Sequence, residues 1–407
     1  METVYIIDAA RSAIGKFLGA LSDLQATEIA TDVVKGLMSR NKFDSNLINE
    51  FIAGNVLSAG IGQNPAKQVV MGSGLPDTIS TANVNMVCAS GMRAVAVGAD
   101  SIRTGNSEIS IVGGMESMSN APYSLRGARK FQKLNNIKIR ELTNRAKGAG
   151  VDVGEYELVD EMVHAGLWDC YSDLHMGALA EKIGSKYNIP RREQDEFALD
   201  SHMKAMHAID NHKFDAEIVP IEVNGKVISS DEGVRRDTSI EKLSALKPAF
   251  EPNGTVTAGN SSQLSDGASF LILMSEKKAN ELGLKPLGVI ESYAYSGTDP
   301  AWYGLAPTEA MKEALKRGGH GLDEMDLIEL NEAFCVQALG VVKELGINKE
   351  ILNVNGGATA LGHPIGATGA RILTTLLYAL KDRNKSIGIA GLCHGGGGAA
   401  AMVIRCL

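Results

Sequence analysis

The feature that most constrains the fold of this chain is an internal repeat, which relates its first part to its last part. The segment TEIATDVVKGL begins at Thr27 and resembles TEAMKEALKRG, which begins at Thr308. Both segments repeat apolar residues at helical spacing, and each threonine is a candidate helix N-cap. Similarity between such distant segments indicates two copies of one structural unit.

A second pair of similar segments follows these helices. LINEFIAGN ends at Asn55 and MDLIELNEAF contains Asn331, so each apolar, strand-like run closes on an asparagine. Cys88 lies 33 residues after Asn55, and His363 lies 32 residues after Asn331. The repeat therefore predicts that Cys88 and His363 occupy equivalent positions in the two halves of one fold.

Each half alternates helical patterns with short buried strands, which is typical of a layered α/β unit with a largely parallel sheet. We expect a first half over residues 1–275 and a second half over 276–407. Between about 122 and 247 the periodicity weakens and charged residues become frequent, which indicates an inserted loop domain. Its basic stretch, RGARKFQKLNNIKIRELTNRAKGAG, is interpreted as a solvated arm or an oligomer contact rather than a ligand site.

Composition excludes several classes of protein. A formal charge of -8 argues against a nucleic-acid-binding protein, which needs an excess of Lys and Arg on one face. The longest apolar runs, such as ILTTLLYAL, fall short of the roughly 20 residues that span a bilayer. The five cysteines are odd in number, widely spaced and without a CxxC pair, which favours free thiols. With no leader pattern at the start, a cytoplasmic location is expected.

Cys88 is a candidate nucleophile. It follows the apolar run NVNMV and precedes ASGMRAV, a helix-like run. At the start of a helix, the macrodipole would lower the pKa of the thiol and favour the nucleophilic thiolate. Taken alone, the pattern is more often that of a small buried core residue.

The second half offers partners for this thiol. His363 lies in a Gly-rich turn before an amphipathic run, where it could accept the Cys88 proton or simply be satisfied within the turn. Cys393 begins the segment CHGGGG, whose Gly395 could present a backbone N–H to an oxyanion, although a glycine hairpin without chemistry fits as well. Asn331 could hold a water or a carbonyl oxygen. A phosphate loop and a zinc site are disfavoured by spacing.

Five segments carry a family resemblance: NMVCASGMRAV, GGMESMSNAPY, NEAF, NVNGGATALGHPIGATGARIL and CHGGGGA. In this order and spacing the chain resembles the thiolase family over its whole length, and most closely the acetyl-CoA acetyltransferase type. The resemblance implies a five-layered α/β/α/β/α fold made of two duplicated halves with an inserted loop domain.

The resemblance also implies catalytic roles. Cys88 would carry the acyl group as a thioester, His363 would activate it, and Cys393 would exchange a proton with the methyl carbon of acetyl-CoA. Asn331 would hold a water that stabilises the enolate oxygen together with His363. The backbone amides of Cys88 and Gly395 would form the oxyanion hole of the acyl-enzyme.

Substrate contacts are implied in the same way. The segment DLHMGALAEK supplies His175 and Met176, VTAGNSSQLSDGA supplies Ser262, and NEAF supplies Phe334. Either Arg235 or Arg236 would reach the nucleotide end of coenzyme A. Expected substrates are acetyl-CoA and acetoacetyl-CoA, with no cofactor, no metal, no nucleic acid and no membrane partner.

The chain departs from the family pattern in three places. His394 stands where many relatives carry an aliphatic residue or Asn, and a satisfied histidine is preferred there over an added titrating group. Ala306 replaces a common Gly, and the segment 126–152 is longer than usual. The expected assembly is a homotetramer, a dimer of dimers.

Three other functions remain open on the sequence. A broad-chain 3-ketoacyl-CoA thiolase would differ in chain-length preference, although the His175–Met176 pair favours short acyl chains. A decarboxylating ketoacyl synthase shares the fold but would replace Cys393. A non-catalytic acyl-CoA-binding protein would bind without acyl exchange.

Overall fold

A computed structural model describes residues 2–131, 136–152, 154 and 156–407. Its main sheet has eleven strands, nine of them in the order β15-β16-β17-β14-β1-β13-β5-β3-β4, with β10 beside β1 and β2 beside β13. The strands are β1 (Val4–Ser12), β2 (Gly15–Lys16), β3 (Glu50–Gly54), β4 (Ser80–Val84), β5 (Ile109–Ser117), β10 (Ile218–Val219), β13 (Ser265–Ser275), β14 (Gly288–Gly297), β15 (Leu327–Leu330), β16 (Ile387–His394) and β17 (Gly398–Cys406). The pairing of β1 with β14 joins the two halves of the sheet.

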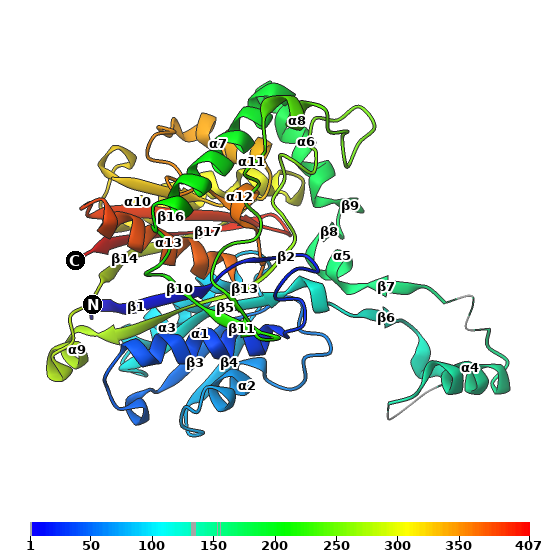
Figure 1. Cartoon of the computed structure of the whole chain (residues 1–407), viewed down its shortest axis with the longest axis horizontal. Coiled ribbons are helices and arrows are strands. Elements are labelled where there is room, and N and C mark those ends of the chain that lie inside the picture. The colour runs from blue at the N-terminus through cyan, green and yellow to red at the C-terminus, as the bar shows by residue number, and fades with distance from the viewer. Residues whose placement is uncertain (1, 132–135, 153, 155) are drawn as a thin grey trace.

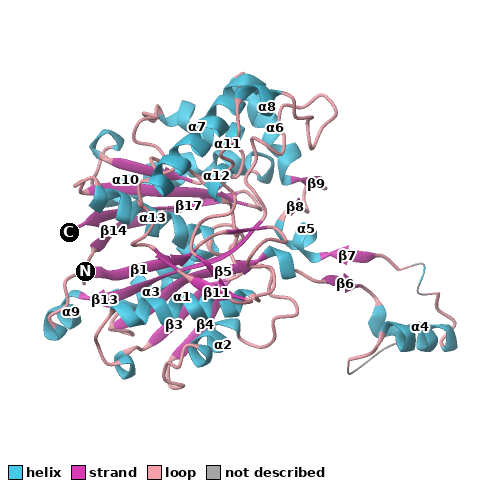
Figure 2. Cartoon of the chain, in the orientation of Figure 1, coloured by secondary structure: helices cyan, strands magenta, loops and turns pink. Residues whose placement is uncertain are grey.

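Helices cover both halves of the sheet and fill the space between them (Figures 1 and 2). The helices of this layered body are α1 (Ala26–Arg40), α2 (Pro65–Gly72), α3 (Ser90–Arg103), α9 (Glu276–Leu282), α10 (Ala306–Gly318), α11 (Cys335–Leu345), α12 (Ala358–Leu361) and α13 (Thr368–Asp382). One apolar cluster lies between α1, α2 and the first-half strands, and another surrounds α3 and α13 between the two half-sheets. A third lies between the second-half strands and α10 and α11. These clusters separate five layers, so the predicted five-layered α/β/α/β/α architecture is confirmed. The expected largely parallel sheet is wrong, because the pairings at its centre, from β5 through β13, β1 and β14 to β17, are antiparallel.

Strand β13 shows why the sheet is covered on both faces. Phe270, Ile272 and Met274 belong to the cluster beneath α1 and α2. The alternate residues Leu271 and Leu273 belong to the cluster around α3 and α13. Side chains of a strand alternate between its faces, so a continuous apolar run is required where both faces are buried.

The repeat of the sequence appears as a repeat of elements. Helices α1 and α10 are equivalent, as are β3 and β15, and α3 and α13. The predicted threonine N-caps are wrong, because Thr27 and Thr308 lie inside the first turns of α1 and α10. Helix α1 begins two residues earlier than a Thr27 N-cap would place it, because Gln25 is the N-cap and the Glu28 carboxylate accepts the Gln25 N–H at 2.7 Å. Helix α10 continues directly from the 3₁₀ helix Pro300–Leu305.

The segment 122–247 contains two parts. An arm built from β6 (Tyr123–Leu125), β7 (Leu158–Asp160) and α4 (Ile139–Gly148) projects from the body, at the right of Figure 1. Helices α6 and α7 pack against α11 and α12 of the second half. The elements of this second part are α5 (Glu161–Gly166), β8 (Trp168–Asp169), β9 (Leu174–His175), α6 (Met176–Tyr187), α7 (Arg191–Asp210), β11 (Ile221–Val223), β12 (Lys226–Ile228) and α8 (Ile240–Ser244). In the described part of the chain, no helix has the length and apolar character needed to cross a bilayer.

Candidate active site

Cys88 lies in a tight turn between β4 and α3. Helix α3 begins at Ser90, so the prediction of a helix directly after the cysteine is confirmed. The Ser90 hydroxyl donates to the Val87 carbonyl at 2.6 Å and accepts the Met86 N–H at 2.8 Å. These bonds hold Val87 at a φ of 47°, a backbone conformation that a β-branched residue rarely adopts. The turn therefore fixes the direction of the Cys88 side chain.

The expected lowering of the Cys88 pKa is wrong for the unliganded chain. Burial raises the pKa of Cys88 to about 12, although hydrogen bonds from the backbone N–H groups of Gly395 and Cys88 itself act in the opposite direction. A buried thiolate loses more hydration than two amide donors return. At neutral pH Cys88 is accordingly a thiol, and its proton must leave as the sulfur attacks.

The hairpin between β16 and β17 brings Cys393 and Gly395 to Cys88. Cys393 is 1% exposed, and burial raises its pKa, with the charge of Cys88 as the next cause. The Gly395 N–H lies close enough to the Cys88 sulfur to lower the pKa of the thiol, so the opposite half of the chain presents a backbone donor to Cys88. Met176 closes this side, since a Cβ added at Gly395 would lie 3.9 Å from its sulfur.

The three glycines at the turn of the hairpin differ in whether another residue could replace them. Gly395 has room for a Cβ, which would lie 3.6 Å from Val87 Cγ1, so freedom from a Cβ clash is not what requires glycine there. Gly396 and Gly397 have φ values of 85° and 83°, and a Cβ at Gly397 would lie 2.4 Å from the Thr298 carbonyl oxygen. The turn itself therefore requires the glycines that follow Gly395.

His363 lies in the turn between α12 and α13, as its Gly-rich context predicts. Its Nδ1 lies 2.6 Å from the Thr368 hydroxyl, and that hydroxyl donates its only proton to the Pro364 carbonyl at 2.9 Å. The hydroxyl oxygen must then accept a hydrogen bond from His363 Nδ1–H, which leaves a lone pair on Nε2. Burial, and then the charge of Arg371, lower the pKa of His363 to about 3. The imidazole is thus neutral and able to accept a proton at Nε2.

Asn331 faces this lone pair. It follows the last residue of β15, and its Nδ2 lies 3.5 Å from His363 Nε2. Asn331 is 1% exposed, and its Oδ1 has no hydrogen-bond partner among the described residues. A buried amide oxygen without a protein partner fits a water or ligand site, because such atoms are otherwise satisfied.

Aromatic rings gather the predicted substrate-binding residues. His175 stacks on Phe250 with a centroid separation of 4.7 Å, and Phe250 meets Phe334 edge-on at 5.8 Å. His175 Nδ1 accepts the Gly177 N–H at 3.0 Å, so its proton lies on Nε2 as a free donor. The Ser262 N–H donates to the Ala333 carbonyl at 3.0 Å, which places Ser262 beside Phe334.

The two candidate arginines differ. Arg235 lines a cavity of about 150 Å³ together with His202 and Lys242. Arg236 instead forms an exposed ion pair with Asp210 at 2.6 Å. The structure therefore separates the pair, and only Arg235 faces a cavity that could take a ligand.

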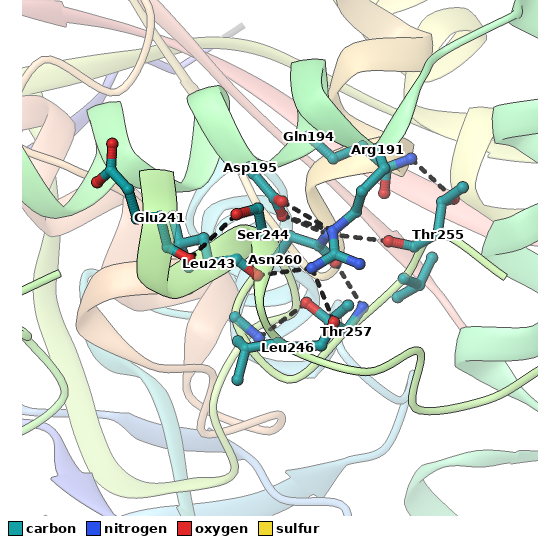
Figure 3. Close-up of polar contacts among 12 residues, drawn as sticks. Arg191, Gln194, Asp195, Glu241, Leu243, Ser244, Leu246, Thr255, Thr257 and Asn260 are labelled. Atoms are coloured by element: carbon teal, nitrogen blue, oxygen red, sulfur yellow. Dashed lines mark hydrogen bonds and ion pairs between the residues drawn. The ribbon is translucent and has the colours of Figure 1, made fainter. Parts of the chain in front are cut away.

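Figure 3 shows a network of polar contacts around Arg191, two of whose partners line this cavity. Arg191 binds Asp195 at 2.8 Å and donates to the carbonyls of Leu243 and Leu246, both of which line the cavity. Asn260 donates to Asp195 at 3.0 Å and so ties the segment before Ser262 to helix α7. The framework holds the cavity wall and the loop of Ser262 in one rigid unit.

Three neighbours of the site were missed from the sequence. Tyr303 donates its hydroxyl proton to the Met176 carbonyl at 3.0 Å, and its pKa responds first to burial and then to both Cys393 and Cys88. Phe250 and Thr368 are the others. Thr368 could have been found from its position five residues after His363, whereas no local pattern marks Tyr303 or Phe250. His394, which departs from the family pattern, donates its Nδ1–H to the Gly395 carbonyl at 2.6 Å and is hydrogen-bonded, as expected.

The chain matches two family models end to end. The model described as Thiolase, N-terminal domain, covers residues 4–277, and Thiolase, C-terminal domain, covers residues 284–406. The chain belongs to the thiolase family. As a member of that family, this thiolase is an acyltransferase.

Relatives of this thiolase are similar over their whole length. It is 44% identical over 409 residues to the acetyl-CoA acetyltransferase of Pseudomonas aeruginosa, covering 99% of each chain. It is 43% identical, again over 99% of each chain, to a probable acetyl-CoA acyltransferase of Staphylococcus epidermidis. The crystal structure of the Bacillus anthracis acetyl-CoA acetyltransferase is 40% identical, covers 100% of this thiolase and 99% of the other chain, and superposes with a TM-score of 0.92.

Proposed function

We propose that this thiolase is an acetyl-CoA C-acetyltransferase, which condenses two acetyl-CoA molecules to acetoacetyl-CoA and free coenzyme A and also catalyses the reverse thiolysis. The observation that carries the proposal is the meeting of Cys88 from one half with Cys393 and the Gly395 N–H from the other. A nucleophile, a second proton carrier and an oxyanion donor are the groups that acyl transfer to carbon requires.

In the first step, the Cys88 sulfur attacks the acetyl carbonyl and its proton passes to His363 Nε2. The carbonyl oxygen, now negative, is bound by the backbone N–H groups of Cys88 and Gly395. The carbon–sulfur bond to coenzyme A then breaks, and the leaving thiolate takes the Cys393 proton. An acetyl thioester on Cys88, a protonated His363 and a Cys393 thiolate result.

In the second step, the Cys393 thiolate removes a proton from the methyl group of a second acetyl-CoA. Burial raises the pKa of Cys393, which makes its thiolate a stronger base. Protonated His363 and a water on Asn331 stabilise the enolate oxygen. The enolate carbon attacks the Cys88 thioester, Cys88 leaves as a thiolate, and it recovers its proton from His363.

Mass spectrometry of the intact protein after incubation with acetyl-CoA tests this function. We expect one acetyl adduct on Cys88, and in Cys88→Ser a rate of adduct formation at least roughly a thousandfold lower, because a serine hydroxyl gives up its proton far less readily. Cys170→Ser is the matched control, since Cys170 is an exposed thiol outside the site and its variant should acetylate normally. Equal labelling of Cys88→Ser would contradict the proposal.

A broader acyl-chain range is a second candidate function, because one 43% identical relative is named an acyltransferase rather than an acetyltransferase. We expect short chains to be preferred, because His175 and Phe334, both implied substrate contacts, pack with Phe250 in one group of rings. Values of kcat/KM for thiolysis of 3-ketoacyl-CoA substrates of increasing length distinguish the two, with a steep fall after four carbons expected.

We further propose that the enzyme works as a cytoplasmic homotetramer without a cofactor, with Arg235 rather than Arg236 at the nucleotide end of coenzyme A. The exposed Cys170 is one of five free cysteines, which suits a reducing compartment. The arm of β6, β7 and α4 offers surface for contact with another copy (Figure 1). Light scattering should give four times the protomer mass of 43.1 kDa. Arg235→Ala should raise the KM for acetyl-CoA more than Arg236→Ala does.

A further inference from the structure

Glu116 is a buried carboxylate beside the active site that the proposed reaction does not use. It lies in β5 with 0% of its surface exposed. One of its oxygens accepts hydrogen bonds from Asn55 Nδ2 at 2.8 Å and the Leu57 N–H at 3.1 Å. The other accepts the Val56 N–H at 3.1 Å and the Gly366 N–H at 3.0 Å.

These four bonds join the two halves of the chain at the site. The donors of residues 55–57 follow β3 of the first half, whereas Gly366 belongs to the second half, three residues after His363. Their packing is close, since a Cβ on Gly366 would lie 2.8 Å from a Glu116 oxygen and 3.0 Å from the Asn55 Cα. The turn that carries His363 is therefore hydrogen-bonded to this carboxylate through Gly366.

The same segments also contact the nucleophile. Val56, Leu57 and Ile365 form one apolar cluster, against which Cys88 packs. Ile365 lies between His363 and Gly366, so a movement of the turn would displace both the base and the wall of the Cys88 pocket. Glu116 thus lies where one side chain can govern the relative positions of Cys88 and His363.

Electrostatics make this carboxylate sensitive to protonation. Burial raises the pKa of Glu116 to about 7, against the opposing effect of the three backbone N–H donors, and the charge of Asp266 raises it further. Cys88 is the other titrating group it faces, because the Glu116 charge raises the Cys88 pKa. When Glu116 is protonated, one of its oxygens carries a proton and faces N–H groups that are donors themselves. The hydrogen bonds that Glu116 accepts from the two loops would then be weakened.

We propose that Glu116 is a positioning residue that holds the His363 turn against the Cys88 pocket, so that proton transfer between the two catalytic groups can occur. The inference rests on the proposed function, because it concerns the acylation of Cys88. A carboxylate is the suitable group, since its two oxygens accept from both loops at once, and an amide has only one oxygen to offer.

The test measures the rate of Cys88 acetylation by rapid quench and mass spectrometry, over a range of acetyl-CoA concentrations, for wild type and Glu116→Gln. The isosteric amide turns an NH2 group toward one pair of donors. We expect the maximal acetylation rate to fall roughly tenfold or more, within the range of a positioned general base. The acetyl-CoA concentration that gives half the maximal rate should stay within about twofold, since Glu116 does not line the cavity of Arg235.

The pH profile separates positioning from a general loss of stability. Wild-type acetylation should rise through pH of about 7 as Glu116 ionises. Glu116→Gln should lack this rise and stay at the low rate. Asp326→Asn is the matched control, because Asp326 also accepts two backbone N–H groups. Asp326 directly precedes β15, whereas Asn331 of the candidate site follows the other end of this strand. Asp326→Asn should lower the stability while the acetylation rate and its pH profile stay unchanged.

Glu116→Asp keeps the charge on a shorter side chain and provides a second variant if the amide variant does not fold. It should reduce the acetylation rate as well, because a shortened carboxylate loses contact with one loop. If either folded variant acetylates Cys88 at the wild-type rate with the wild-type pH profile, the positioning role is wrong. If wild type itself forms no Cys88 adduct, the proposed function fails instead.

Discussion

At the scale of single residues, the position of the His363 proton follows from counting the hydrogen-bond donors and acceptors around it. Thr368 has one hydroxyl proton, and the Pro364 carbonyl takes it. His363 Nδ1 must then be the donor to Thr368, and the lone pair of Nε2 faces Asn331. Cys88 and His363 are both neutral at rest, with pKa values of about 12 and about 3. The pair avoids burying two charges before substrate arrives.

Thr368→Val tests this assignment of the His363 proton. Valine has the same shape but removes the acceptor of Nδ1–H, so the proton can move to Nε2 and the base is lost for part of the time. We expect kcat for thiolysis to fall roughly ten- to a hundredfold, as for a misoriented general base. Thr374→Val is the control on the same helix, since its hydroxyl contacts Ser269 at 2.9 Å, and it should leave kcat unchanged.

At the scale of elements, the β16–β17 hairpin delivers Cys393 and Gly395 together. Strand β16 ends at His394 and β17 begins at Gly398, so a three-residue turn separates them. The sequence allows a hairpin here, because its glycine run is followed by an apolar, strand-like segment. Which glycine has a steric reason could not be predicted, because the Thr298 carbonyl that approaches Gly397 comes from a distant segment.

Gly397→Ala and Gly396→Ala distinguish two requirements for glycine in this turn: a positive φ and the absence of space for a Cβ. Both residues have a positive φ, which costs an alanine about 1 kcal/mol. Only at Gly397 would the new Cβ also meet a backbone atom, at 2.4 Å, whereas at Gly396 nothing lies within 4 Å. Gly397→Ala should therefore lower the free energy of unfolding by clearly more than Gly396→Ala, as measured by urea denaturation.

At the scale of the whole molecule, acid should weaken the fold through buried neutral histidines. His202 is 3% exposed, accepts the Arg235 N–H at 3.2 Å, and has a pKa lowered to about 4 by burial and then by Arg235. The unfolded chain binds a proton near pH 6.5, so the stability from His202 is complete above pH 6.5 and is lost as pH falls toward 4. Glu116 acts oppositely, since its raised pKa removes stability as pH rises toward 7.

His202→Gln isolates the histidine contribution. The variant should have a lower sensitivity of the free energy of unfolding to acid, because glutamine does not titrate. Between pH 7.5 and pH 5.0 the wild type should lose about 2 kcal/mol more than the variant, from the shift of its pKa. Urea unfolding at the two pH values gives this difference, and equal losses in both proteins would show that His202 is not buried in its neutral form.

The sequence by itself predicted the duplicated α/β architecture and, through the family resemblance, the candidate reacting groups. Apolar periodicity and the repeat are local or one-dimensional signals, and they place Cys88 and His363 at equivalent junctions before any contact is known. The helix that starts after Cys88 followed from the helix-like run behind it, whereas a hairpin after Cys393 was only one of two interpretations of the glycine run.

Only the tertiary structure decided the state of these groups and the residues that hold them. The expected pKa of Cys88 was wrong because burial, which depends on the packing of both halves, outweighs the effect of one helix start. The role of Glu116 depends on donors 60 residues before it and 250 residues after it. Hydration and hydrogen-bond partners are properties of three-dimensional neighbours, and no local pattern of residues specifies them.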